Sequence, residues 1–78
     1  LSFMKKVINK VTYNTDTAEL LNSKSFGNFG EDSGYEEKLY VTKKGAYFLH
    51  CIGGTESKYP QEEIIPLSKE QKTEWENE

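Results

Sequence analysis

The two most reactive side chains in this sequence are its single histidine, His50, and its single cysteine, Cys51, and they are adjacent. To act together, a histidine base and a thiol nucleophile must lie within hydrogen-bonding distance of each other. Neighbouring residues on a strand point to opposite faces, and this segment is predicted to be a strand. The pair therefore favours a buried thiol and a half-exposed histidine over a catalytic dyad, and we expect no enzymatic activity.

Metal and phosphate motifs are also sparse. A structural zinc site takes about four Cys or His ligands, and His50 and Cys51 are the only two such residues. The acids between positions 31 and 37 lack the alternation of a calcium-binding EF-hand loop. The segment Gly53-Gly54-Thr55 lacks the fixed spacing of the Walker phosphate loop. The sequence thus predicts no metal site and no other cofactor.

The distribution of charge is the remaining sequence feature that bears on function. The formal net charge is −3, and all 10 basic residues are lysine. Residues 61–78 contain two lysines and six glutamates, so the carboxyl end is acidic, whereas residues 1–60 are nearly neutral. Without arginine the chain cannot read base edges with a rigid bidentate fork, which disfavours direct nucleic-acid recognition. A carboxylate-rich surface can instead compete for a basic groove that normally holds nucleic acid.

We expect a protein partner to be contacted by the exposed acids and by two aromatic side chains. An ordinary solvated surface is the alternative explanation for the same acids. The aromatic residues of the Glu37–Ile52 segment, together with its lysines, could also stack and screen a single nucleic-acid strand. The candidate contact residues are Glu31, Asp32, Glu36, Glu37, Glu62, Glu63, Glu70, Glu74, Phe29 and Tyr40.

Three or four antiparallel strands must position these side chains. Residues 5–13 predict a strand or a hairpin turning at Asn9-Lys10, and residues 62–67 predict a last short strand. The clearest signal lies between them, where apolar runs flank Thr42-Lys43-Lys44-Gly45, a type I turn closed by glycine. This turn sets Val41 opposite Tyr47, Tyr40 opposite Phe48, Leu39 opposite Leu49 and Lys38 opposite His50.

That register separates two faces of the hairpin. Leu39, Val41, Tyr47, Leu49 and Cys51 form the better core face. On the other face Tyr40 pairs with Phe48, and this face is expected either to lie under a helix or to remain an aromatic patch.

Two helices are expected. Asn14 or Thr15 would cap a short helix that continues to about Asn22, with Asp16 complementing the positive helix end. The segment 23–35, rich in Ser, Gly and Asn, is expected to be a loop. Ser68 and Gln71 fit a capping box for a last helix, which Trp75 would pin to the core.

These elements predict an α+β fold in a single domain spanning residues 1–78. It comprises a small antiparallel sheet of three to four strands, a short helix after the first strand and a C-terminal helix. A chain this short buries only about 60% of its unfolded surface, so a homodimer is one way to add stability.

The expected compartment is the cytoplasm, because a single cysteine permits no internal disulfide. No apolar run approaches the length of a membrane span, so we expect no membrane partner. Residues 1–3 precede Met4, which predicts that Met4 is the native start and that the residues before it remain from cloning.

One further pattern is carried by the segments Tyr13–Leu20, Glu37–Leu49, Gly53-Gly54, Ser57-Lys58-Tyr59 and Ile64–Ser68. These segments resemble small proteins carried by phages, plasmids and conjugative elements of Firmicutes, and the resemblance covers most of the chain. The domain is similar to the small or fused modules of type II anti-CRISPR proteins from staphylococci and related bacteria. The resemblance implies stoichiometric inhibition of an RNA-guided CRISPR nuclease, by blocking guide RNA or target DNA. The sequence departs from the usual pattern at His50-Cys51-Ile52, which is commonly more polar, and in a shorter loop after Gly54.

Overall fold

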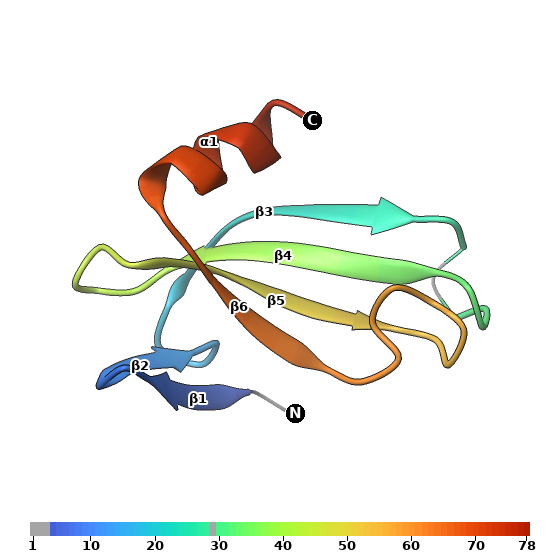
Figure 1. The fold of residues 1–78 in the computed structure, drawn as a ribbon, viewed down its shortest axis with the longest axis horizontal. Helices are drawn as coiled ribbons and strands as arrows, with labels where there is room; N and C mark the ends of the chain where they lie inside the picture. The colour runs from blue at the N-terminus through green and yellow to red at the C-terminus, as the bar shows by residue number, and fades with distance from the viewer. Residues whose placement is uncertain (1–3, 29) are drawn as a thin grey trace.

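Residues 4–28 and 30–78 are described by this computed structural model, and they form six strands and one helix. Strands β3, β4, β5 and β6 make one antiparallel sheet in that order, and β1 and β2 make a separate hairpin. Helix α1 lies on one side of the sheet and the hairpin on the other (Figure 1). The elements are β1 (Lys5–Ile8), β2 (Val11–Asn14), β3 (Glu19–Phe26), β4 (Tyr35–Val41), β5 (Tyr47–Gly53), β6 (Glu63–Leu67) and α1 (Lys69–Glu76).

The predicted α+β class is wrong, because the structure is mostly β and the helix expected after the first strand is absent from the described residues. Asn14 does accept a hydrogen bond from the Asp16 amide at 2.9 Å, and the Ala18 amide bonds to the Asn14 carbonyl at 3.0 Å. That turn is not continued, because Glu19–Phe26 pairs with β4 instead. A helix of two turns is marginal alone, whereas strand pairing bonds the backbone of the whole segment.

The β4–β5 hairpin confirms the predicted register. Val41 pairs with Tyr47, and the pairing continues through Lys38 and His50. Gly45 has φ of 90°, the left-handed conformation that the turn requires of it. Of the two alternatives for residues 5–13, the structure has the hairpin that turns at Asn9-Lys10, and both residues have positive φ between β1 and β2.

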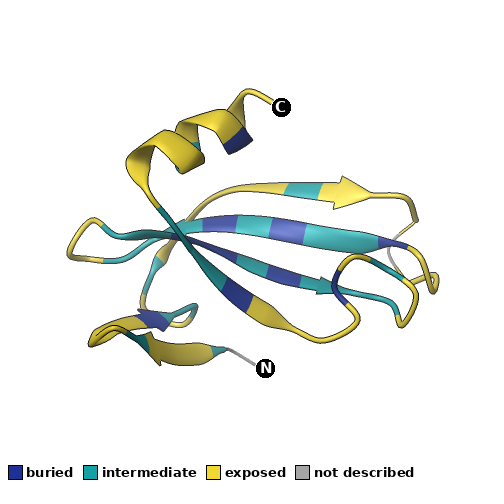
Figure 2. Cartoon of the chain, in the orientation of Figure 1, coloured by how far each residue is buried: buried dark blue, intermediate teal, exposed yellow. Residues whose placement is uncertain are grey.

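The four-stranded sheet is buried on both faces at its central strands β4 and β5, whereas the edge strand β3 is largely exposed (Figure 2). One face packs against α1 and the loop before β6, and its buried residues are Leu39, Leu49, Cys51, Tyr59 and Trp75.

The opposite face carries Ile64 and the Tyr40–Phe48 pair, and Tyr13 of β2 packs on it. Neither expected alternative is observed for this aromatic face. It is not covered by a helix and it is not left open, because the β1–β2 hairpin packs on it.

Helix α1 follows its sequence signals closely. The Ser68 hydroxyl accepts from the Gln71 amide at 3.0 Å, and the Gln71 side chain accepts from the Ser68 amide at 2.8 Å, which confirms the capping box. Trp75 is the buried residue of the helix, as predicted. In the described part of the chain, no helix has the length and apolarity needed to cross a lipid bilayer.

Candidate partner-binding surface

The predicted acidic contacts lie at three separate places rather than on one surface. Glu31 and Asp32 are exposed in the loop between β3 and β4, and Glu70 and Glu74 are exposed on α1. Glu62 and Glu63 are exposed where β6 begins, and the Glu62 carboxylate lies 2.5 Å from Nε2 of His50.

Four other predicted contacts have different surroundings. Glu36 is half-buried, and its carboxylate lies 3.5 Å from the ammonium of Lys38. Tyr40 is half-buried and stacked on Phe48, with ring centroids 5.2 Å apart. Glu37 is only 5% exposed, so it is not available as a surface contact. Phe29 lies outside the described residues.

Glu37 instead forms the centre of a buried polar network that joins three elements. Its carboxylate accepts from Nε1 of Trp75 at 2.8 Å and from the hydroxyl of Tyr59, and Lys58 lies 3.7 Å away. The network connects β4, the loop before β6 and α1. Alternation along β4 could have revealed it, because Glu37 shares the core face with Leu39. Its role is to hold the helix on the sheet.

Cys51 and Tyr59 lie beside this network, and both resist ionisation. Burial raises the pKa of the Cys51 thiol from 9.0 to about 12. Burial and the hydrogen bond to the Glu37 carboxylate raise the pKa of the Tyr59 hydroxyl well above its usual range. The Cys51 side chain is fully buried, as predicted. A protonated, enclosed thiol is a poor nucleophile.

These shifts predict that the protein loses stability at alkaline pH. Between pH 9 and the raised value, the unfolded chain releases the Cys51 proton while the folded chain keeps it, so the free energy of unfolding falls as pH rises. By about pH 10 the expected loss from Cys51 is on the order of 1 kcal/mol. Urea denaturation of the wild type and of Cys51→Ala at several pH values measures it. A wild-type curve parallel to that of Cys51→Ala would contradict the prediction.

The loop that carries Glu31 and Asp32 is held in place by its backbone. The Glu56 amide donates to the Asp32 carbonyl at 2.8 Å, and the Gly54 amide donates to the Gly34 carbonyl at 2.9 Å. A Cβ atom at Gly54 would lie 2.5 Å from the Glu31 carbonyl oxygen, so the close approach requires glycine. We call Glu31, Asp32 and Glu56 the acidic end.

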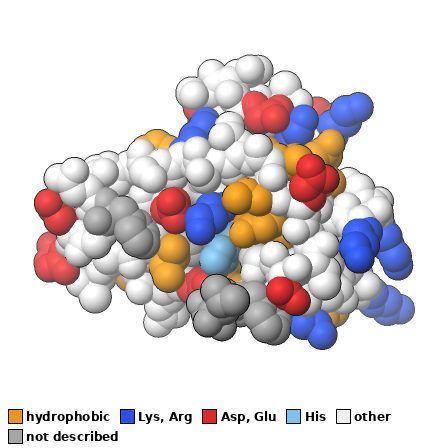
Figure 3. Space-filling model, turned by 180° about the vertical axis from the view of Figure 1, so that it is seen from behind, with side chains coloured by type: hydrophobic (Ala, Val, Ile, Leu, Met, Phe, Trp, Pro, Cys, Tyr) orange, Lys and Arg blue, Asp and Glu red, His pale blue; other side chains and the backbone are white. Residues whose placement is uncertain are grey.

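The opposite end of the molecule is basic. Lys10, in the β1–β2 turn, and Lys43 and Lys44, in the β4–β5 turn, line one hollow and form what we call the basic end. Seen from behind in Figure 3, lysine atoms gather at the right and acidic atoms mark the left edge. The longest dimension of the protein is 35 Å, so the two ends are separated by more than a Debye length of about 8–10 Å.

Comparison with known proteins yields no match to a family model, a curated protein or a solved structure. Within residues 4–28 and 30–78, no three His, Cys, Asp or Glu side chains are placed to share a metal ion. The arrangement presents two surfaces of opposite charge that are suited to binding.

Proposed function

We propose that this protein is a non-catalytic cytoplasmic module that inhibits a protein partner stoichiometrically, with the acidic end occupying a basic groove. One observation carries the proposal: Glu31, Asp32 and Glu56 are exposed, and none of them forms an ion pair within the described residues. Backbone hydrogen bonds join the two loops that carry these acids, so little conformational entropy is lost when they bind.

The positions of the reactive residues support a role without chemistry. Cys51 is enclosed on the α1 face, whereas His50 points to the other face and contacts Glu62. These two side chains do not form a nucleophile and base pair. Inhibition by occupancy requires only a surface that complements the partner in charge and shape.

The class of partner comes from the resemblance to anti-CRISPR proteins, which points to an RNA-guided type II nuclease. Such nucleases hold the guide and target strands in a positively charged channel. Carboxylates at the end of a small domain can take the place of backbone phosphates in that channel. The proposed result is a block of guide RNA or target DNA binding.

Base stacking by the β4–β5 hairpin has less support as a function. Phe48 is fully buried, and Tyr40 is stacked on it. The Tyr47 ring faces the α1 side, where the ammonium of Lys72 lies 5.0 Å from its centroid. Stacking on nucleic-acid bases requires an open aromatic face.

The test titrates the protein against a purified type II nuclease, with and without guide RNA, by calorimetry. We expect the double variant Glu31→Lys/Asp32→Lys to raise Kd by about a hundredfold, because like charges would meet across the interface. The matched control is Asp16→Lys/Glu19→Lys, which makes the same charge change at exposed acids outside the acidic end. Its Kd should stay within about threefold of the wild type.

Two results would count against the proposal. If neither form of the nuclease binds, the partner class is wrong. If both double variants weaken binding equally, the effect comes from net charge, and the acidic end is not the contact surface.

A further inference from the structure

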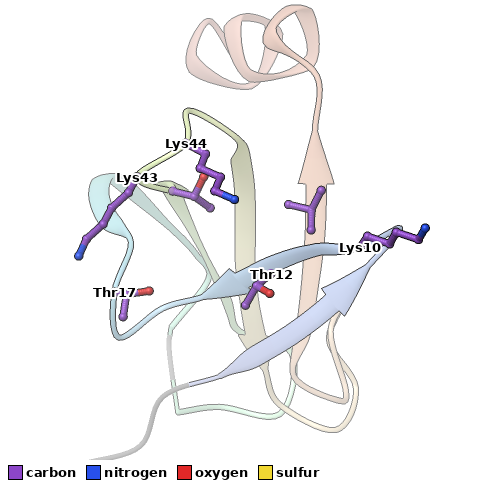
Figure 4. Close-up of a pocket in the computed structure, with 7 residues that line it drawn as sticks. Lys10, Thr12, Thr17, Lys43 and Lys44 are labelled. Carbon is purple, nitrogen blue, oxygen red and sulfur yellow. The ribbon is translucent and has the colours of Figure 1, made fainter.

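The basic end contains a cavity that the proposed function does not use. Its volume is about 260 Å³, and Figure 4 shows it between the β1–β2 hairpin and the β4–β5 turn. No acidic residue is among the described residues that line it, which are Lys10, Val11, Thr12, Thr17, Thr42, Lys43 and Lys44.

Tertiary packing builds this cavity from segments far apart in the sequence. Tyr13 of β2 packs edge-on against Phe48 of β5, with ring centroids 5.4 Å apart. That contact docks the β1–β2 hairpin and carries Lys10 to the same end as Lys43 and Lys44. The β4–β5 turn is itself fixed, because the Ala46 amide donates to the Thr42 hydroxyl at 3.0 Å.

The lysines of the cavity are not neutralised by nearby carboxylates. None of the three forms an ion pair within residues 4–28 and 30–78. Glu19 and Lys43 are the charged residues that line an adjoining hollow, and Glu19 does not line the cavity itself. In Figure 4, Lys44 reaches across between the two turns, whereas Lys10 and Lys43 extend outward on opposite sides.

We propose that this cavity binds backbone phosphates of a single-stranded nucleic acid. Ammonium and threonine hydroxyl groups are hydrogen-bond donors to phosphate oxygens. A single phosphate would draw the lysines inward, whereas the outward course of Lys10 and Lys43 suits successive phosphates of one strand. The chain has no arginine and the described lining of the cavity has no aromatic ring, so the contact is independent of base sequence.

The net charge of −3 disfavours such binding only for a protein whose charges are evenly spread. Here the acidic end lies beyond the screening distance, so a strand at the basic end meets the local positive charge. The inference goes beyond the proposed function, because it concerns the opposite end of the molecule.

The test measures fluorescence anisotropy of a labelled thymidine oligonucleotide against salt concentration. Three phosphate contacts predict a logarithmic slope of about −2, so affinity should fall about twentyfold from about 50 mM to about 200 mM salt. The triple variant Lys10→Asn/Lys43→Gln/Lys44→Gln should remove this salt dependence and most of the binding. Asparagine is chosen at Lys10 because it tolerates the positive φ of that turn.

Three controls define the outcomes. Lys69→Gln removes an exposed lysine on α1 and should leave binding unchanged. Inorganic phosphate should bind far more weakly than the oligonucleotide, and equal affinity would show a small-ligand site and overturn the assignment to a strand. A triple variant that binds like the wild type, or a wild type that does not bind at low salt, would also overturn it.

The two proposals fail separately. The variant Glu31→Lys/Asp32→Lys changes the acidic end alone, so it should lose the protein partner and keep the oligonucleotide. Loss of both would show that the variant has lost its fold, which circular dichroism detects independently.

Discussion

Replacing Glu37 with alanine is expected to lower the free energy of unfolding by about 3 kcal/mol, because two buried donors lose their acceptor. Nε1 of Trp75 donates to this carboxylate at 2.8 Å, and the Tyr59 hydroxyl donates to its other oxygen. Both aromatic residues are buried, so water cannot replace the lost bonds without opening the core. Urea denaturation followed by tryptophan fluorescence measures the change.

Two further variants distinguish the effect of losing the buried hydrogen bonds from the effect of losing a surface charge. Glu37→Gln keeps a carbonyl oxygen for Trp75, and we expect it to cost less than Glu37→Ala. Glu36→Ala removes the neighbouring half-exposed carboxylate and its pair with Lys38, a loss of about 1 kcal/mol or less. Equal losses for Glu36→Ala and Glu37→Ala would contradict a structural role for the network.

Replacing Phe48 with alanine is expected to cost about 3–5 kcal/mol, the usual range for a fully buried phenylalanine. Phe48 is fully buried on β5, where it contacts Tyr13 edge-on and Tyr40 face-on. The Tyr13 contact docks the β1–β2 hairpin on the sheet, so the loss should also free the hairpin. Urea denaturation gives the total cost, and hydrogen exchange of the Thr15 amide, which bonds to the Met4 carbonyl, reports on the hairpin.

A control on the same face of β5 makes this prediction specific. Ile52 is half-buried and lies on the same face of the strand as Phe48 and His50. Ile52→Ala should lower stability by a smaller amount and leave exchange of the Thr15 amide unchanged after correction for global stability. If Phe48→Ala leaves that amide equally protected, the hairpin is held by other contacts.

The β4–β5 hairpin and the capping box of α1 could be predicted because their signals are local. The Thr42–Gly45 turn sets the register of the paired strands, and the Ser68 and Gln71 side chains bond within one turn of backbone. Part of the candidate site could also be predicted from local sequence. Glu31 and Asp32 lie in a segment rich in Gly, Ser and Asn, which indicates an exposed loop without knowledge of distant contacts.

Other features depended on partners distant in the sequence. The segment Asn14–Asn22 carries a helix cap and a short apolar run, yet the pairing of β3 with β4 outweighs that weak local preference for helix. The acidic side chain of Glu37 predicts a surface position, but hydrogen bonds from Tyr59 and Trp75 offset the desolvation cost of burying its carboxylate. Neither partner lies within twenty residues of it.

By itself, the sequence determined the turns, the pairing of β4 with β5, the capped helix and the charge of each segment, because these depend on neighbours along the chain. Only the tertiary structure decided which charges face solvent together. It buried Glu37 and separated the acids of the loop from those of α1. It also brought Lys10 to Lys43 and Lys44, through the packing of Tyr13 on Phe48. The physical reason is that such contacts form only when sheet and hairpin exclude water from a shared core.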